Sequence, residues 1–167
     1  NFNHFILDIA WFGVLNGSAI AFIAVYATRL GASTFQISLL NASPAVVNLM
    51  FALPAGRWLQ NQPISRATFN SSVIHRWFYL AWIFLPFFFA PQEQIWLIVL
   101  MTVLMSIPGT ALSIGFNGLF AATVPPEWRA QIVGTRNAAY ALTSIVVTLI
   151  CGWLLDALPF PLGYQVV

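Results

Sequence analysis

Charged residues are scarce in this sequence. Only 6% of the 167 residues carry a charge, six basic and four acidic, whereas soluble domains average about 25%. Ten charges cannot cover the surface of a compact body of this size, which excludes a soluble globular domain, a disordered chain and a nucleic-acid-binding protein. The sequence has instead 60% hydrophobic residues and a mean hydropathy of +0.84. We therefore expect a protein whose surroundings are lipid.

Residues for covalent and metal chemistry are equally scarce. The single cysteine, Cys151, lies inside an apolar run, which excludes an intrachain disulfide framework and a cysteine-rich metal site. The two histidines, His4 and His75, lie far apart in the sequence. No nucleophile elbow, phosphate-binding loop or dinucleotide-binding glycine pattern occurs. We predict no enzymatic activity, no cofactor and no metal.

Long apolar runs are what the sequence does have. A spanning helix needs roughly 20 mostly apolar residues, and the charges, prolines and turn residues divide the chain into five such helices and the start of a sixth. Ser33 or Thr34 is a plausible N-cap for the second helix. We predict an all-α integral membrane protein with a single transmembrane domain over residues 1–167. The helices are expected over about 5–27, 34–59, 70–89, 94–121 and 132–155, with 163–167 opening the sixth.

The arginines predict the orientation. We number the connections between successive predicted helices from the N-terminus. The odd-numbered connections hold one arginine, Arg29, whereas the even-numbered connections and the helix ends beside them hold the other five arginines. Positive residues concentrate on the cytoplasmic side of membrane proteins. We therefore expect a cytoplasmic N-terminus, in the cell (cytoplasmic or inner) membrane. The five are Arg57, Arg66, Arg76, Arg129 and Arg136.

Uncharged polar residues form stripes on four of the five predicted helices. Between Trp77 and Ala90, the only polar group of the third helix is the Tyr79 hydroxyl. On the first helix, at about 100° per residue, Asp8 and Tyr26 lie at nearly the same angle around the axis. Polar side chains are costly against acyl chains, so four helices are expected to surround a polar cavity with the third outside. The alternative is that these groups only bond helices together. The cavity candidates are Asn16, Tyr26, Asn41, Asn48, Ser106, Thr110, Ser113, Asn117, Asn137, Tyr140 and Ser144.

Glycine and proline suggest how the helices pack. Gly13-x-x-x-Gly17 permits close approach of two backbones. Pro44, Pro86 and Pro108-Gly109 fall inside predicted helices and indicate kinks or hinges.

Asp8 is the sharpest ionisable candidate. It lies within the first apolar run, with His4 one turn before it on nearly the same face. One interpretation is a proton or cation site formed by the pair. The other is an interfacial carboxylate favoured by the helix dipole. Candidates for a cytoplasmic gate, which could equally be topology signals alone, are Gly56, Arg57, Arg66, Glu127, Arg129 and Arg136.

Three segments resemble the major facilitator superfamily of transporters. Residues 30–40 are similar to its outer turn into helix 2, residues 54–59 with Arg66 to its loop between helices 2 and 3, and residues 124–137 to its loop between helices 4 and 5. The resemblance implies the N-terminal half of a secondary transporter, with helices 1, 2, 4 and 5 lining the cavity and helix 3 peripheral. Residue 1 is asparagine and an apolar run starts at Val166, so we expect a truncated chain whose partner is the missing C-terminal half.

The sequence also departs from that family. Gln60 stands where the loop between helices 2 and 3 usually has an aspartate. Helix 4 lacks the basic residue of proton-coupled members, and helix 5 lacks the Gly-Pro motif of drug/proton antiporters. These differences argue against drug export and against a standard proton-coupling site. The predicted function is alternating-access transport of a small solute. Sugars, other polar solutes and amphipathic compounds fit equally well as that solute. The alternatives are a membrane structural or interaction protein and a channel subunit.

Overall fold

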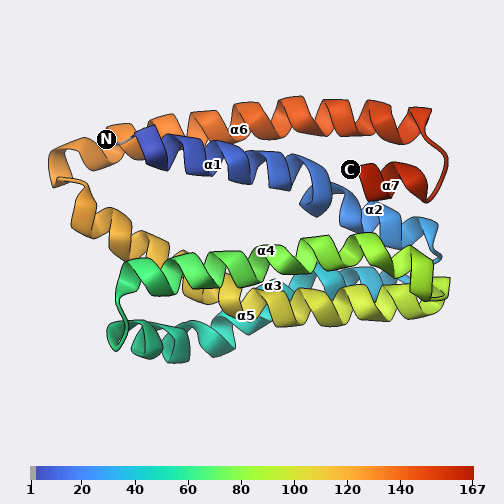
Figure 1. Cartoon of the computed structure of the whole chain (residues 1–167), viewed down its shortest axis with the longest axis horizontal. Coiled ribbons are helices and arrows are strands. Elements are labelled where there is room, and N and C mark those ends of the chain that lie inside the picture. Colours follow the sequence, from blue (N-terminus) through green and yellow to red (C-terminus); the bar gives the residue numbers. More distant parts are fainter. Residues whose placement is uncertain (1–2) are drawn as a thin grey trace. The chain divides into compact units, whose positions relative to one another are not determined.

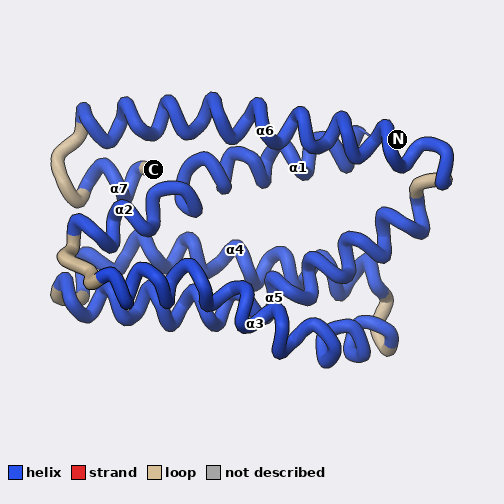
Figure 2. Tube along the Cα trace, turned by 180° about the vertical axis from the view of Figure 1, so that it is seen from behind, coloured by secondary structure: helices blue, strands red, loops and turns tan. Residues whose placement is uncertain are grey.

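The computed structural model describes residues 3–167, and of Asn3 only the backbone. No strand occurs in this range, and Figures 1 and 2 show helices joined by short connections. The helices are α1 (Asn3–Leu15), a π-helical turn (Asn16–Ile20), α2 (Ala21–Arg29), α3 (Thr34–Gln60), α4 (Ile64–Phe88), α5 (Pro91–Thr123), α6 (Pro126–Ala157) and α7 (Leu162–Val166).

Within residues 3–167, four helical segments are long and apolar enough to cross a membrane: His4–Arg29, Thr34–Gln60, Pro91–Thr123 and Pro126–Ala157. They correspond to the first, second, fourth and fifth predicted spans. The third predicted span lies in α4, which is long but carries His75, Arg76 and several Trp and Tyr side chains of low hydropathy. An all-helical protein with membrane-compatible helices is thus confirmed, whereas five spans plus a sixth stay a prediction.

Local chemistry explains where the helices begin. Ser33 caps α3 as expected: its hydroxyl accepts from the Gln36 amide, while the Gln36 side chain accepts from the Ser33 amide. Three helices start earlier than the hydrophobic runs indicate, at Ile64, Pro91 and Pro126. Each begins at or directly after a proline, because the fixed φ of proline suits a first turn and its missing N–H has no intrahelical partner there.

The first span is interrupted by the π-helical turn at Asn16–Ile20, and the ribbon bends there (Figure 1). A π-turn holds one residue more than an α-turn. One residue corresponds to about 100° of rotation, so the alignment of Asp8 with Tyr26, which assumed a continuous α-helix, is wrong by about that angle.

The helices form two compact units. Unit 1 combines the described residues up to Tyr26 with Val124–Val167, and unit 2 is Ala27–Thr123. In unit 1, α1 packs against α6, and α7 folds back beside α6. In unit 2, α5 packs against both α3 and α4, which contact each other little. The single-domain assignment stays a prediction.

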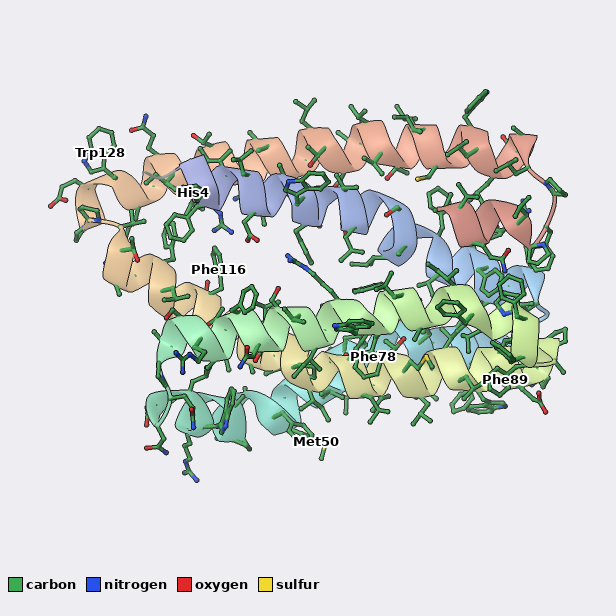
Figure 3. The ribbon with its side chains drawn as sticks, viewed as in Figure 1. His4, Met50, Phe78, Phe89, Phe116 and Trp128 are labelled. Atoms are coloured by element: carbon green, nitrogen blue, oxygen red, sulfur yellow. The ribbon has the colours of Figure 1, made fainter. Side chains whose placement is uncertain are left out.

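The core of unit 2 lies along α5. Ile95 and Ile98 are each only 1% exposed, and Leu40 of α3 and Leu85 of α4 are buried as well. Large apolar side chains also cover the outside of the helices: Met50 points away from α3 and Trp128 away from α6 (Figure 3). Such an apolar exterior suits a lipid environment.

Candidate functional site

The polar stripe of α5 divides at the helix-interior Pro108. Before it, Thr102 and Ser106 are buried, as is Thr110 just after it. Their hydroxyls donate to carbonyls of their own helix: Thr102 to Ile98 at 2.8 Å, Ser106 to Thr102 at 2.6 Å and Thr110 to Ser106 at 2.9 Å. Such back-bonding satisfies a hydroxyl without a partner helix or water. These three residues therefore serve packing, although Ser106 and Thr110 were cavity candidates.

The remaining stripe residues of α5 have the opposite environment. Ser113 and Asn117 are exposed, although they lie at the same helical angle as Thr102 and Ser106 to within about 60°. Beyond Thr110 the buried residues are Ala111 and Gly115, on roughly the opposite side. The buried face of α5 thus changes sides after Thr110, which leaves Ser113 and Asn117 at the surface of unit 2.

On α3 the polar stripe is separate from the packing face. Gln36, Leu40, Ser43 and Val47 are buried along one line of the helix. Asn41 and Asn48 are exposed and lie roughly 130° away from that line. A third face, roughly 115° to the other side, carries exposed apolar residues. The polar face consists of Thr34, Ser38, Asn41 and Asn48, and the apolar one includes Phe35, Val46, Leu49 and Leu53.

The stripe of α6 mostly faces α1. Ser144 donates to the Gly13 carbonyl at 3.1 Å, and Thr148 donates to the Gly17 carbonyl at 3.2 Å. Tyr140 stacks on Phe12 with 6.0 Å between ring centroids. Of the cavity candidates on this helix, only Asn137 is exposed. Ser144 and Tyr140 thus join two helices, as the alternative interpretation of the stripes expects.

The two cavity candidates of the first span are also engaged. The Asn16 amide donates to the Ser144 hydroxyl at 3.5 Å, and the residue is half-buried. Tyr26 is buried against Phe160 and Tyr164, with ring centroids 5.7 Å and 5.1 Å away. Tyr26 therefore belongs to an aromatic cluster that joins α2 to α7.

Asp8 lies near the positive charge of Arg136. Arg136 is half-buried, its Nε donates to the Phe5 carbonyl at 3.3 Å, and the Asp8 carboxylate attracts its guanidinium. Asp8 and His4 are themselves exposed. The arrangement ties the start of α1 to the first half of α6, and Arg136 is one of the two arginines, with Arg57, for which the sequence suggested Asp8 or Glu127 as a partner.

The gate candidates lie at helix ends within their own units. Arg57, Arg66 and Glu127 are exposed, and no atom lies within 4 Å of the position that a Cβ would take at Gly56. Arg129 is half-buried, and its Nε donates to the Val124 carbonyl at 3.0 Å, closing the turn before α6.

The sequence did not lead us to predict a row of aromatic side chains with polar atoms on α4. His75, Tyr79 and Trp82 stack edge to face, with centroids 5.4 Å and 5.0 Å apart, and His75 lies against Gly109 of α5. Trp82 Nε1 is buried without a hydrogen-bond partner. The spacing of these residues, four and then three positions, is the signal that could have indicated a shared face. Within the described residues, no group of three potential metal ligands occurs.

Comparison with models of known families, with curated proteins and with solved structures finds no match for this chain. Of the predicted cavity residues, those with exposed side chains are Asn41 and Asn48 on α3, Ser113 and Asn117 on α5, and Asn137 on α6.

Proposed function

We propose that this chain is the N-terminal half of a secondary transporter of the major facilitator type, which moves a small uncharged polar solute by alternating access. It would lie in the cell membrane with its N-terminus in the cytoplasm and work together with a C-terminal half. The observation that carries the proposal is a series of exposed, neutral polar side chains spaced along α3 and α5, here called the polar line: Asn41, Asn48, Ser113 and Asn117.

Exposing these polar side chains in a membrane is energetically costly unless water or a solute forms hydrogen bonds with them. Amide side chains facing hydrocarbon lose their hydrogen bonds, yet Asn41, Asn48, Ser113 and Asn117 are all exposed on two adjacent helices of unit 2. Leu59 lies beside Gly115, and this register spreads the four residues over about 30 Å at 1.5 Å per residue. A hydrocarbon core is about as thick. Along the helix axes, the four side chains are thus spread over about the thickness of a membrane core.

The pairing of helices also supports the proposal. Transporters of this type contain repeats of three helices within each half, so helix 1 corresponds to helix 4, and helix 2 to helix 5. The predicted first helix packs on the fifth, and correspondingly the fourth packs on the second. The predicted fourth helix also packs on the third. The repeat makes this contact equivalent to one between the first and sixth helices, and Tyr26 packs against Tyr164 there.

Alkylation of single cysteines tests the proposal. In the complete protein with Cys151→Ala, we would place cysteine at Asn41 or at Asn117, near opposite ends of the polar line. Ser106→Cys is the control, because Ser106 is buried in the same unit. Sealed vesicles are then treated from each side with a membrane-impermeant maleimide.

Each function predicts a different labelling pattern. A transporter exposes the two positions alternately, so a translocated solute lowers labelling of one and raises labelling of the other. A channel subunit leaves both open together, and a structural protein protects both as well as it protects Ser106→Cys. Labelling of neither asparagine position would refute transport.

The interaction-protein alternative has one observation in its favour. Hydroxyls at Ser106, Thr110 and Ser144 bond to backbone carbonyls, as expected of residues that only hold helices together. It leaves the exposed asparagines unexplained, which is why transport is the better proposal.

Coupling is proposed to involve Asp8. It is an exposed acid in the first span beside Arg136, and an acid in a span commonly marks an ion pathway. Asp8→Asn in the complete protein should abolish the pH dependence of uptake. Unchanged pH dependence would show that coupling resides elsewhere.

A further inference from the structure

The π-helical turn at Asn16–Ile20 has unusual hydrogen-bonding needs. The Ala21 amide donates to the Asn16 carbonyl, five residues back. Where an α-helix changes to this pattern, carbonyls near the change lose their regular donor. In a membrane no water replaces that donor. Other groups must therefore supply hydrogen bonds around Gly13–Gly17.

Hydroxyl groups supply these bonds. Ser144 donates to the Gly13 carbonyl at 3.1 Å and Thr148 to the Gly17 carbonyl at 3.2 Å. Within the span, Ser18 donates to the Val14 carbonyl at 2.8 Å. The two bonds from α6 are four residues apart on both helices, so they form one ladder along the turn.

The two glycines make this ladder possible. A Cβ at Gly17 would lie 2.6 Å from the Ser144 carbonyl oxygen, and one at Gly13 would lie 2.9 Å from the Tyr140 carbonyl oxygen. Both obstacles are backbone atoms, which cannot turn aside. Only glycine therefore brings the carbonyls of α1 within reach of short side chains on α6.

Thr143 shows that a hydroxyl at this interface does not have to cross it. Its side chain lies against Gly13, yet its hydroxyl donates to Ala139 at 2.8 Å and to Tyr140 at 3.1 Å, both in its own helix. The hydroxyls that donate across the interface are those of Ser144 and Thr148, which lie beside the carbonyls at the π-turn.

We infer that Ser144 and Thr148 are positioning residues that hold the first span in its π form. Without the π-turn, the same sequence as a regular α-helix would rotate α2 by about 100° relative to α1. The span therefore has two discrete forms, and the α6 hydroxyls select one. Under the proposed function, on which this consequence rests, the selection sets the direction of Asn16 relative to α2.

A one-residue deletion provides the decisive test. Removing Ala19 takes the extra residue out of the turn and should leave a regular α-helix with α1 and α2 facing their present directions. In the full chain, Ser144→Ala with Thr148→Val should raise the unfolding equilibrium constant about eightfold in mixed micelles. In the Ala19 deletion the same pair should change it less than about twofold, because the ladder no longer has a π-turn to hold.

Thr143→Val is the matched control, and it should change the unfolding constant less than about twofold in both backgrounds. Equal costs of the double substitution with and without Ala19 would overturn the inference, since they would indicate ordinary contact between helices. So would a Thr143→Val effect as large as that of the pair.

Amide hydrogen exchange gives a second readout if the deletion variant does not fold. Peptides covering residues 17–21 should exchange about tenfold faster in Ser144→Ala with Thr148→Val and stay unchanged in Thr143→Val. Unchanged exchange in the double variant would overturn the inference. Neither measurement requires transport, so a protein that passes both but moves no solute refutes the proposed function alone.

Discussion

The two units join apolar helices in different ways. In unit 1, Gly13 and Gly17 let the backbones of α1 and α6 meet, and hydroxyls cross between the helices. In unit 2, large apolar side chains such as Ile95 and Leu85 fill the space around α5, and its hydroxyls return to their own helix. Lipid provides no hydrophobic drive between helices, so both solutions depend on close packing.

The difference indicates what decides the fate of a membrane hydroxyl. Ser144 and Ser106 are the same residue type in similar helices, but only Ser144 has a neighbouring carbonyl exposed by glycine. Where the backbones stay apart, the carbonyl four residues back is the nearer acceptor. Backbone separation therefore matters more than residue identity, and substitutions that change it should have the largest effects.

The largest effect is expected from Gly17→Ala. Its Cβ would lie 2.6 Å from the Ser144 carbonyl oxygen, so the helices of unit 1 must separate, at a cost of about 3 kcal/mol of unfolding free energy. Gly152→Ala in α6, where no atom lies within 4 Å, is the control and should be neutral or slightly stabilising. Unfolding in mixed micelles measures both, and equal costs would remove the distinction between the units.

Gly115→Ala in unit 2 should cost less, about 1 to 2 kcal/mol. The new Cβ meets the side chain of Thr68, which can be shortened. Thr68→Ala should restore about half of the loss. Thr143→Ala should rescue Gly13→Ala less completely, because it removes the Thr143 hydroxyl but leaves the Tyr140 carbonyl oxygen 2.9 Å away. Double-mutant cycles measure both pairs. Full rescue at Gly13 would contradict backbone contact as the basis of unit 1.

Arg136→Gln should have an intermediate effect of about 1 kcal/mol, confined to the start of unit 1. It removes the bond from Nε to the Phe5 carbonyl and the attraction of Asp8. Amide exchange should accelerate about fivefold in peptides covering residues 5–9. The exposed Arg57 provides the control, and Arg57→Gln should leave those peptides unchanged.

The smallest effect is expected from Ser106→Ala, less than about 0.5 kcal/mol. Its hydroxyl bonds only to the Thr102 carbonyl of the same helix, so no contact between helices is lost. The melting temperature of the purified protein measures it. A cost above 1 kcal/mol would show that the hydroxyls of unit 2 hold helices together after all.

Hydropathy and capping rules predicted much of the fold. They placed most helices and the cap at Ser33 because these depend on local sequence. They did not predict the π-turn, since a one-residue excess at Asn16–Ile20 is stabilised by Ser144 and Thr148, more than a hundred positions later. Local patterns contain no such information.

Periodicity predicted the polar stripes but not which residues remain open. That depends on the neighbouring helix, which one sequence pattern does not specify. Chemistry offers a partial guide, because hydroxyls on a helix can bond to the preceding turn. Thr102 and Ser106 do so and are buried, whereas Asn41, Asn48 and Asn117 remain exposed. Weighting amides above hydroxyls would have improved the prediction, with Ser113 and the half-buried Asn16 as exceptions.

The pairing of α1 with α6 has a consequence for biosynthesis. Contacts from Phe5 to Arg136, Gly13 to Ser144 and Gly17 to Thr148 all join residues 131 positions apart, while all of unit 2 lies between them in the chain. At 5 to 20 residues per second, the ribosome adds each partner residue on α6 roughly 7 to 26 seconds after the residue it contacts on α1. Unit 2 can assemble during that interval, whereas the glycine face of α1 must wait in the membrane for a partner not yet made.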